Sequence, residues 1–156
     1  MRFSTWAPLA QTSVDVLLRG ERLPLQRHED GWWHGDHDAE PGDRYSFSLD
    51  GGDPRTDPRA LRLPEGPEGT CEVVDLSHVQ WNDTGWRGAQ LAGSIVYEMH
   101  IGTFSDDGTF AGAIERLDHL VDLGVDIVEV MPLATFPGVH GWGYDGVGLY
   151  AVHEPY

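Results

Sequence analysis

The sequence predicts a multidomain chain, in which an antiparallel β-sandwich of immunoglobulin-like architecture is followed by a βαβ unit. Two observations carry this prediction. From Phe3 to about Asp75, short runs of alternating apolar and polar residues are separated by turn residues, with no helical period. Residues 94–132 instead read as strand, helix and strand, and such a unit requires two parallel strands with a right-handed crossover.

Alternation marks the individual strands of the first part. The runs that meet the pattern are residues 14–18, 22–25, 44–49 and 71–75. In the first run, Val14, Val16 and Leu18 share one face, and the third run ends at the turn sequence of residues 50–54. Because Cys71 is the only cysteine, the predicted sandwich has no internal disulfide.

Tryptophans of the first part are candidates either for the core or for sugar contact. Trp6 is expected to open the first strand, and Trp32 and Trp33 are adjacent in another. Neighbouring residues of a strand point to opposite faces, so one of that pair packs in the core and the other is outward. Flat aromatic rings pack against pyranose faces, but packing explains these rings more simply, and sugar contact by the outward ring stays an alternative.

A segment of mixed polarity separates the two parts. We place the sandwich at residues 1–76, a connecting segment at 77–92, and the βαβ part at 93–156. Trp81 and Trp86 lie in the connecting segment, and we expect both side chains to pack at the interface between the two parts.

The second part begins with a β-branched and aromatic strand over residues 95–99. A helix follows, with Thr109 or Asp107 as its cap and Gly124 at its end. Its apolar stripe consists of Phe110, Ile114, Leu117, Leu120 and Val121. A second apolar strand spans residues 125–131. Since both strands are apolar on two faces and the helix covers one, more chain or another subunit must cover the rest, and a truncated chain is expected to self-associate.

Composition argues against several classes of partner. The formal net charge is −16, with 26 acidic and 10 basic residues, whereas nucleic-acid binding depends on Lys and Arg that neutralise phosphates. No apolar run approaches the roughly 20 residues of a membrane span, and the N-terminus lacks the pattern of a signal peptide. We therefore expect no nucleic-acid partner, no membrane association and a cytoplasmic location, which also suits the lone cysteine.

Candidate binding residues cluster in the glycine- and aromatic-rich stretch that follows the second strand. They are His140, Trp142, Tyr144 and Asp145. In βα architectures the carboxyl end of a parallel strand carries the functional loops, and this mixture offers stacking rings, hydrogen-bond donors and a carboxylate. Tyr144 as a loop anchor and Asp145 as a plain turn residue are the alternatives.

Three stretches resemble the opening of the catalytic barrel of the α-amylase superfamily, glycoside hydrolase family 13. They are VYEMHIGTFS at 96–105, IVEVMP at 127–132 and GWGYDG at 141–146. The FSTWAP start and the Asp57-Pro58 step resemble the branching, debranching and trehalose-forming members, which carry an N-terminal immunoglobulin-like domain. The resemblance spans essentially the whole chain. It implies that residues 93–156 are the first βαβ unit and loop of a (β/α)8 TIM barrel.

The resemblance also implies retaining cleavage of an α-1,4 glucosidic bond in an α-glucan, most closely one that ends in trehalose, by two carboxylates. The family's nucleophile and acid/base lie on later strands, beyond Tyr156, so no catalytic residue is expected here and the chain is a fragment or the covered part of a longer enzyme. Tyr144 would correspond to the aromatic that stacks on the sugar, with Asp145 and Trp142 beside it. Branching or debranching activity, and a non-catalytic α-glucan-binding or bracing module, remain alternatives.

Other polar residues are interpreted without catalytic roles. His100, which follows the first strand of the βαβ unit, is expected to pack and form hydrogen bonds. Glu98 and Glu129 lie within the two strands and are not assigned as a catalytic pair, because the family places its acids later in the chain. The eight histidines are scattered without metal-ligand spacing, so neither a metal site nor a cofactor is expected.

Overall fold

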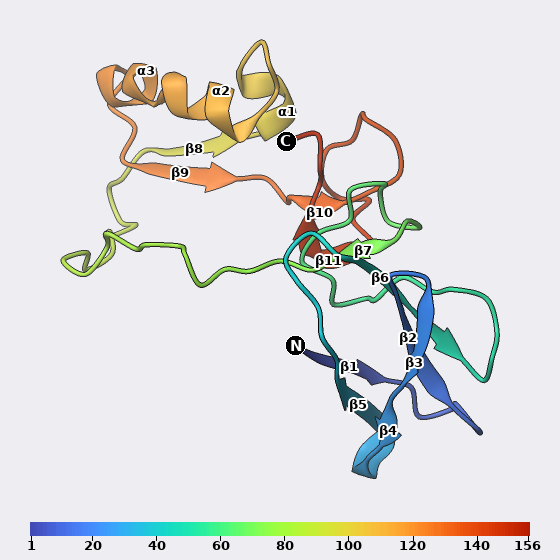
Figure 1. Cartoon of the computed structure of the whole chain (residues 1–156). Coiled ribbons are helices and arrows are strands. Elements are labelled where there is room, and N and C mark those ends of the chain that lie inside the picture. Colours follow the sequence, from blue (N-terminus) through green and yellow to red (C-terminus); the bar gives the residue numbers. More distant parts are fainter.

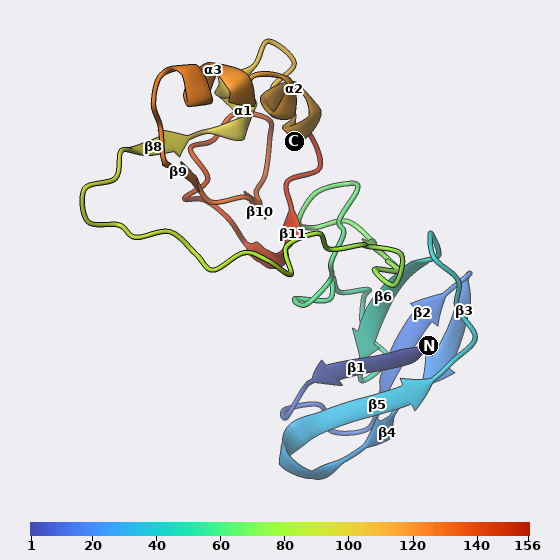
Figure 2. The same ribbon diagram turned by 90° about the vertical axis from the view of Figure 1, so that its left-hand side faces the viewer.

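The computed structural model describes residues 1–156, and two bodies make up the chain (Figures 1 and 2). The N-terminal body contains two antiparallel sheets, with strand orders β1-β5-β4 and β3-β2-β6-β7. Their strands are β1 (Arg2–Trp6), β2 (Val14–Leu18), β3 (Glu21–Pro24), β4 (Gln26–Arg27), β5 (Trp32–Asp36), β6 (Arg44–Leu49) and β7 (Cys71–Glu72), with a short 3-10 turn, η1 (Glu29–Gly31), before β5. The predicted β-sandwich is therefore confirmed as a small all-β body.

The alternation in the sequence identifies the centre of this body correctly. Val14, Val16 and Leu18 are buried, and β2 pairs antiparallel with both β3 and β6. Phe47 and Leu63 complete the same apolar core. Two details of the prediction are wrong. The last strand is only the two-residue β7, and Trp6 closes β1 instead of opening it.

Trp32 and Trp33 point to opposite faces of β5, as predicted. Trp33 is buried in the core, where its indole N–H donates to the carbonyl oxygen of Ala7 at 3.2 Å. The half-buried ring of Trp32 has the guanidinium of Arg59 at 5.5 Å and the imidazole of His34 stacked at 5.8 Å. The outward ring is therefore already in contact with protein groups, which favours packing as its role.

A buried polar cluster closes the long loop after β6 onto the sheet. The Tyr45 hydroxyl donates to Asp57 Oδ2 at 2.9 Å, and the backbone N–H of Asp57 donates to Cys71 Sγ at 3.1 Å. Burial, the largest cause, raises the pKa of the Cys71 thiol to about 11. Desolvation disfavours the thiolate, because a charge cannot be hydrated in the interior.

We expect Cys71 to resist a water-soluble disulfide reagent as long as the sandwich is folded. At pH 8 a thiol with a pKa of about 11 is thiolate in only about one molecule in a thousand, and burial blocks access as well. In denaturant the thiol should return to a pKa of about 8.5 and react completely. Rapid stoichiometric labelling of the native chain would contradict this description of the cluster.

The second body is the predicted βαβ unit. Strands β8 (Val96–Met99) and β9 (Ile127–Val130) pair in parallel, with the register Val96 to Ile127 and Met99 to Val130. Between them lie α1 (Ile101–Phe104), α2 (Phe110–Glu115) and α3 (Leu117–Asp122). The predicted cap is confirmed, since Thr109 Oγ1 accepts from Gly112 N at 3.1 Å. Gly124 adopts the left-handed φ of 83° that ends the helical region.

The expected single helix differs from the structure in two ways. It is broken at Arg116, whose φ of −105° and ψ of 1° separate α2 from α3. Its apolar stripe also faces solvent: of the five stripe residues only Leu120 is buried. Small residues explain the difference, because Gly112 and Ala113 form the buried face of α2, and a Cβ on Gly112 would lie 2.4 Å from Ser105 Oγ.

Residues 77–92 contain neither helix nor strand, and every one of them is exposed. The expectation that Trp81 and Trp86 pack at an interface is wrong, since they are 77% and 72% exposed. The hydrogen bonds of this segment, such as the one that Trp86 N donates to Asp83 O, join only residues close in sequence. The helices of this structure are too short or too polar to cross a lipid bilayer.

We expect the 156-residue chain to self-associate through the uncovered helix face. Ile114 and Val121 are exposed there, and apolar surface of this kind favours association. In sedimentation velocity experiments, Ile114→Glu should shift the chain toward monomer, because a charge at such a contact is costly to desolvate. Leu9→Glu, at an exposed apolar position on the sandwich, is the matched control. A monomeric parent chain across the concentration range would contradict this expectation.

Candidate functional site

The stretch after β9 folds back on itself beside the ends of the two parallel strands. It contains a short antiparallel pair that the sequence analysis did not identify, β10 (Ala134–Thr135) and β11 (Gly148–Val152). The loop between them carries the GWGYDG sequence of residues 141–146. Figure 1 shows this pair between the sandwich and the βαβ unit.

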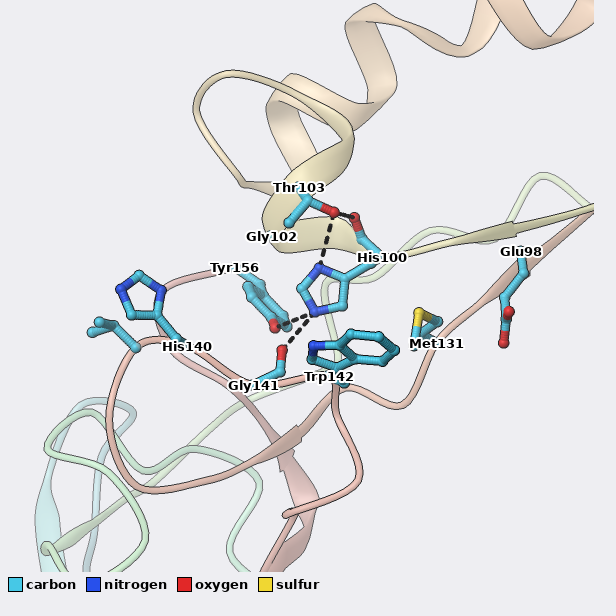
Figure 3. Close-up of a pocket in the computed structure, with 10 residues that line it drawn as sticks. Glu98, His100, Gly102, Thr103, Met131, His140, Gly141, Trp142 and Tyr156 are labelled. Carbon is cyan, nitrogen blue, oxygen red and sulfur yellow. Dashed lines mark hydrogen bonds between the residues drawn. The ribbon is translucent and has the colours of Figure 1, made fainter.

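A cavity of about 580 Å³ opens at the carboxyl ends of β8 and β9. His100 and Thr103 line it from the end of β8 and from α1, and Met131 lines it from the end of β9. Trp142 and Tyr156 form its other wall (Figure 3). The cavity therefore lies at the edge of the sheet where the sequence predicts functional loops, and its function stays a prediction.

His100 lies at the centre of the hydrogen bonds around this cavity (Figure 3). Its Nε2 lies 2.7 Å from the carbonyl oxygen of Gly141 and 3.2 Å from the hydroxyl of Tyr156, and its Nδ1 lies 3.3 Å from Thr103 Oγ1. A carbonyl oxygen only accepts, so Nε2 must carry the hydrogen, and Nδ1 can then accept from the Thr103 hydroxyl. The expectation of a hydrogen-bonded histidine is therefore confirmed, and His100 ties the end of β8 to the loop after β9.

Two glycines allow the backbone to come this close. Gly143 has a φ of 89°, and a Cβ there would lie 2.2 Å from the carbonyl oxygen of Pro132. A Cβ on Gly102 would lie 2.9 Å from both the His100 and Tyr156 rings. Any larger residue at either position would force the loop or the ring pair apart.

Aromatic rings pack against Tyr156, which lines the cavity. Phe136 stacks on His153 with ring centroids 3.8 Å apart, and the His153 ring meets Tyr156 edge-on at 4.9 Å. His153 is buried, its Nε2 has no hydrogen-bond partner, and burial lowers the pKa of its imidazole. Burial likewise raises the pKa of the Tyr156 hydroxyl. Both groups are therefore held neutral near pH 7.

The structure separates the four candidate binding residues into two pairs. His140 and Trp142 line the cavity, whereas Tyr144 and Asp145 lie outside it; all four residues are exposed, Trp142 by 76% and Tyr144 by 68%. Gly143, with its left-handed φ of 89°, lies between the two pairs. These positions describe where the residues lie, and their contact with a substrate stays a prediction.

Sequence reasoning missed part of the cavity wall. Tyr156 gave no signal, because an aromatic at the end of a polar stretch has no pattern to mark it. Glu98 lines the cavity, and it is the register partner of Glu129 on the neighbouring strand, with both side chains exposed. No group of three or more His, Cys, Asp or Glu residues has metal-binding geometry.

We expect His100→Ala to loosen the loop of residues 139–146. The substitution removes the hydrogen bond to Gly141, and a bond worth about 1 kcal/mol corresponds to about fivefold faster amide exchange in a locally opening segment. Hydrogen exchange measured by mass spectrometry would detect this. His140→Ala is the control, because His140 lines the same cavity but forms no hydrogen bond. Equal exchange in both variants would show that His100 does not hold the loop.

No family model matches the sequence, but known proteins do. A malto-oligosyltrehalose trehalohydrolase from Arthrobacter ramosus is 48% identical over 99% of this chain, and a 1,4-alpha-glucan branching enzyme from Salinibacter ruber is 33% identical over 96%. The chain spans 28% of the length of each.

Solved structures agree with the sequence relatives. A putative alpha amylase from Salmonella typhimurium is 43% identical over 99% of this chain, with a TM-score of 0.91, and a pullulanase from Anoxybacillus sp., solved with maltotetraose, is 25% identical with a TM-score of 0.82. This chain covers 26% and 28% of those two chains. Over its whole length the chain is therefore related to the N-terminal part of the malto-oligosyltrehalose trehalohydrolases, within the α-amylase group of enzymes.

Proposed function

We propose that this chain acts as the N-terminal part of a retaining α-glucan hydrolase. The enzyme would cleave the α-1,4 bond next to the trehalose end of malto-oligosyltrehalose and release trehalose. The observation that carries the proposal is the 48% identity over 99% of the chain to a malto-oligosyltrehalose trehalohydrolase. A cavity at the carboxyl ends of two parallel strands is the physical feature that such a site requires.

The proposal includes a finer division of the chain. Residues 1–76 would be an immunoglobulin-like domain, residues 77–92 a connection, and residues 93–156 the opening βαβ unit of a (β/α)8 barrel in a cytoplasmic enzyme. Two antiparallel sheets and one parallel strand pair support this division. The exposed apolar side chains of β8 and β9 would be covered by further barrel strands.

The residues of this chain would bind and orient the substrate. Retaining cleavage needs a nucleophile and an acid/base about 5–5.5 Å apart on either side of the bond. We assign neither role to residues 1–156 and place both carboxylates on later strands. Tyr144 would stack on the sugar next to the bond, with Asp145, Trp142 and His140 around it, and no cofactor takes part.

A chimera tests the proposal. Residues 1–156 would replace the matching stretch of the Arthrobacter ramosus relative, and we expect the chimera to release free trehalose from malto-oligosyltrehalose. Tyr144→Ala should lower kcat/KM on the order of 100-fold, because a sugar without its stacking ring is misplaced relative to the carboxylates. Tyr144→Phe keeps the ring and should retain most activity. Product chromatography measures both effects.

The outcomes of these experiments distinguish between the candidate functions of the chain. A folded chimera without trehalose release would overturn the proposal, and equal activity of Tyr144→Ala and Tyr144→Phe would remove the stacking role. New α-1,6 branches would instead support the branching alternative, which the 33% identical branching enzyme favours as second candidate. Glucan binding by the 156-residue chain that is lost in Trp32→Ala would support a binding module.

A further inference from the structure

We propose that Arg62 and Glu154 are positioning residues, through which the sandwich fixes the wall of the cavity described above. The inference rests on the proposed function, since it gives the sandwich a part in the same site. It assigns neither residue to substrate contact. The ion pair would instead hold Tyr156, and through Tyr156 and His100 the loop that begins at Gly141.

Strand β11, which follows the βαβ unit in the chain, packs on the sandwich through apolar groups. Ala151 of β11 is buried in the same core cluster as Leu63, which belongs to the loop after β6. A Cβ added to Gly148 would lie 3.0 Å from Leu63 Cδ1, so the strand rests directly on this loop. Such a contact fixes the distance between the bodies, but it has no directional group to fix the segment that follows β11.

Arg62 supplies the directional contact. Its Nε lies 3.1 Å from both carboxylate oxygens of Glu154, and a second guanidinium nitrogen reaches Glu154 as well. Its remaining nitrogen donates to Glu72 of β7 at 2.7 Å, and Glu72 also pairs with Arg44 of β6 at 3.3 Å. A planar guanidinium held by two carboxylates has a fixed orientation.

This pair is the only polar link between the bodies. No other side-chain hydrogen bond or ion pair joins residues 1–76 to residues 93–156, and none of the backbone hydrogen bonds does so. The hydrogen bond from Arg62 lowers the pKa of the Glu154 carboxyl. Glu154 is therefore ionised throughout the neutral range, and the link persists there.

The link continues from Glu154 to the cavity. Tyr156, two residues further on, is held by a turn in which its N–H donates to the carbonyl oxygen of His153 at 3.0 Å. Its hydroxyl meets His100 Nε2 at 3.2 Å, and the same nitrogen lies 2.7 Å from the Gly141 carbonyl oxygen. An unbroken series of contacts therefore runs from the sandwich to the loop with Trp142.

Global stabilisation is a weaker account of the pair. The side chains of Arg62 and Glu154 are 49% and 33% exposed, and ion pairs at exposed positions typically contribute between zero and about 1 kcal/mol to stability. The geometry, by contrast, is fixed on one side by two strands of the sandwich. The pair is therefore better suited to setting a position than to stabilising the whole fold.

Hydrogen exchange on the 156-residue chain tests the proposal without any need for activity. We expect Arg62→Ala and Glu154→Ala each to speed exchange in residues 139–146 by severalfold, and the double variant to add nothing further. Arg19→Ala is the matched control: it breaks the 2.6 Å pair with Asp43 within the sandwich, and Arg19 is similarly exposed at 45%. Exchange in residues 14–18 reports global stability and should stay unchanged.

Faster exchange confined to residues 57–72 and 153–155 would overturn the proposal, because it would show that the ion pair orders only its immediate neighbours. The same would follow if Arg19→Ala loosened residues 139–146 equally. In the chimera, Arg62→Ala should lower kcat about tenfold with little change in KM, whereas Arg19→Ala should change neither. An inactive chimera that still shows the exchange coupling would overturn the proposed function and leave this inference standing.

Discussion

The hydrogen bond between His100 Nε2 and the Gly141 carbonyl oxygen is the interaction on which the site depends. Parallel strands place their carboxyl ends at one edge, but the loops that follow are free to diverge from there. This bond brings the loop after β9 back over the end of β8. The close approach in turn requires Gly143, whose left-handed φ allows the chain to pass the carbonyl oxygen of Pro132. One histidine and one glycine therefore hold the loop that forms one wall of the cavity.

Strands β8 and β9, which carry this site, have apolar side chains that no other part of residues 1–156 covers. Val96 and Val130 are exposed, and Glu98 is the register partner of Glu129. Like charges on paired positions repel, and exposed apolar side chains forgo roughly 25 cal/mol for each Å² that burial would remove from water. Both costs fall if other groups cover the apolar side chains and place a cation near the carboxylates. The further barrel strands proposed above would provide such cover, and this chain spans 28% of the length of the relative from Arthrobacter ramosus.

Sequence patterns predict the strands in which burial of one or both faces imposes a regular order of apolar residues. Strands β2 and β6 were found because a period of two follows directly from burial of one face, and β8 and β9 because both faces are apolar. The predicted helix face is wrong because an apolar period marks large side chains, whereas the small residues Gly112 and Ala113 are the buried ones. Trp142 and Tyr144 lie on either side of Gly143, whose left-handed φ of 89° no side-chain pattern records.

The hydrogen bonds of His100 also limit its chemistry. Its Nε2–H is shared between the Gly141 carbonyl and the Tyr156 hydroxyl, and its Nδ1 faces the Thr103 hydroxyl. A general base needs an unoccupied lone pair within reach of the substrate, and neither ring nitrogen offers one. Removing a hydrogen bond to gain that lone pair would release the loop that forms the cavity. His100, at the end of a parallel strand, is therefore suited to holding the loop of this site in place and not to taking up a proton.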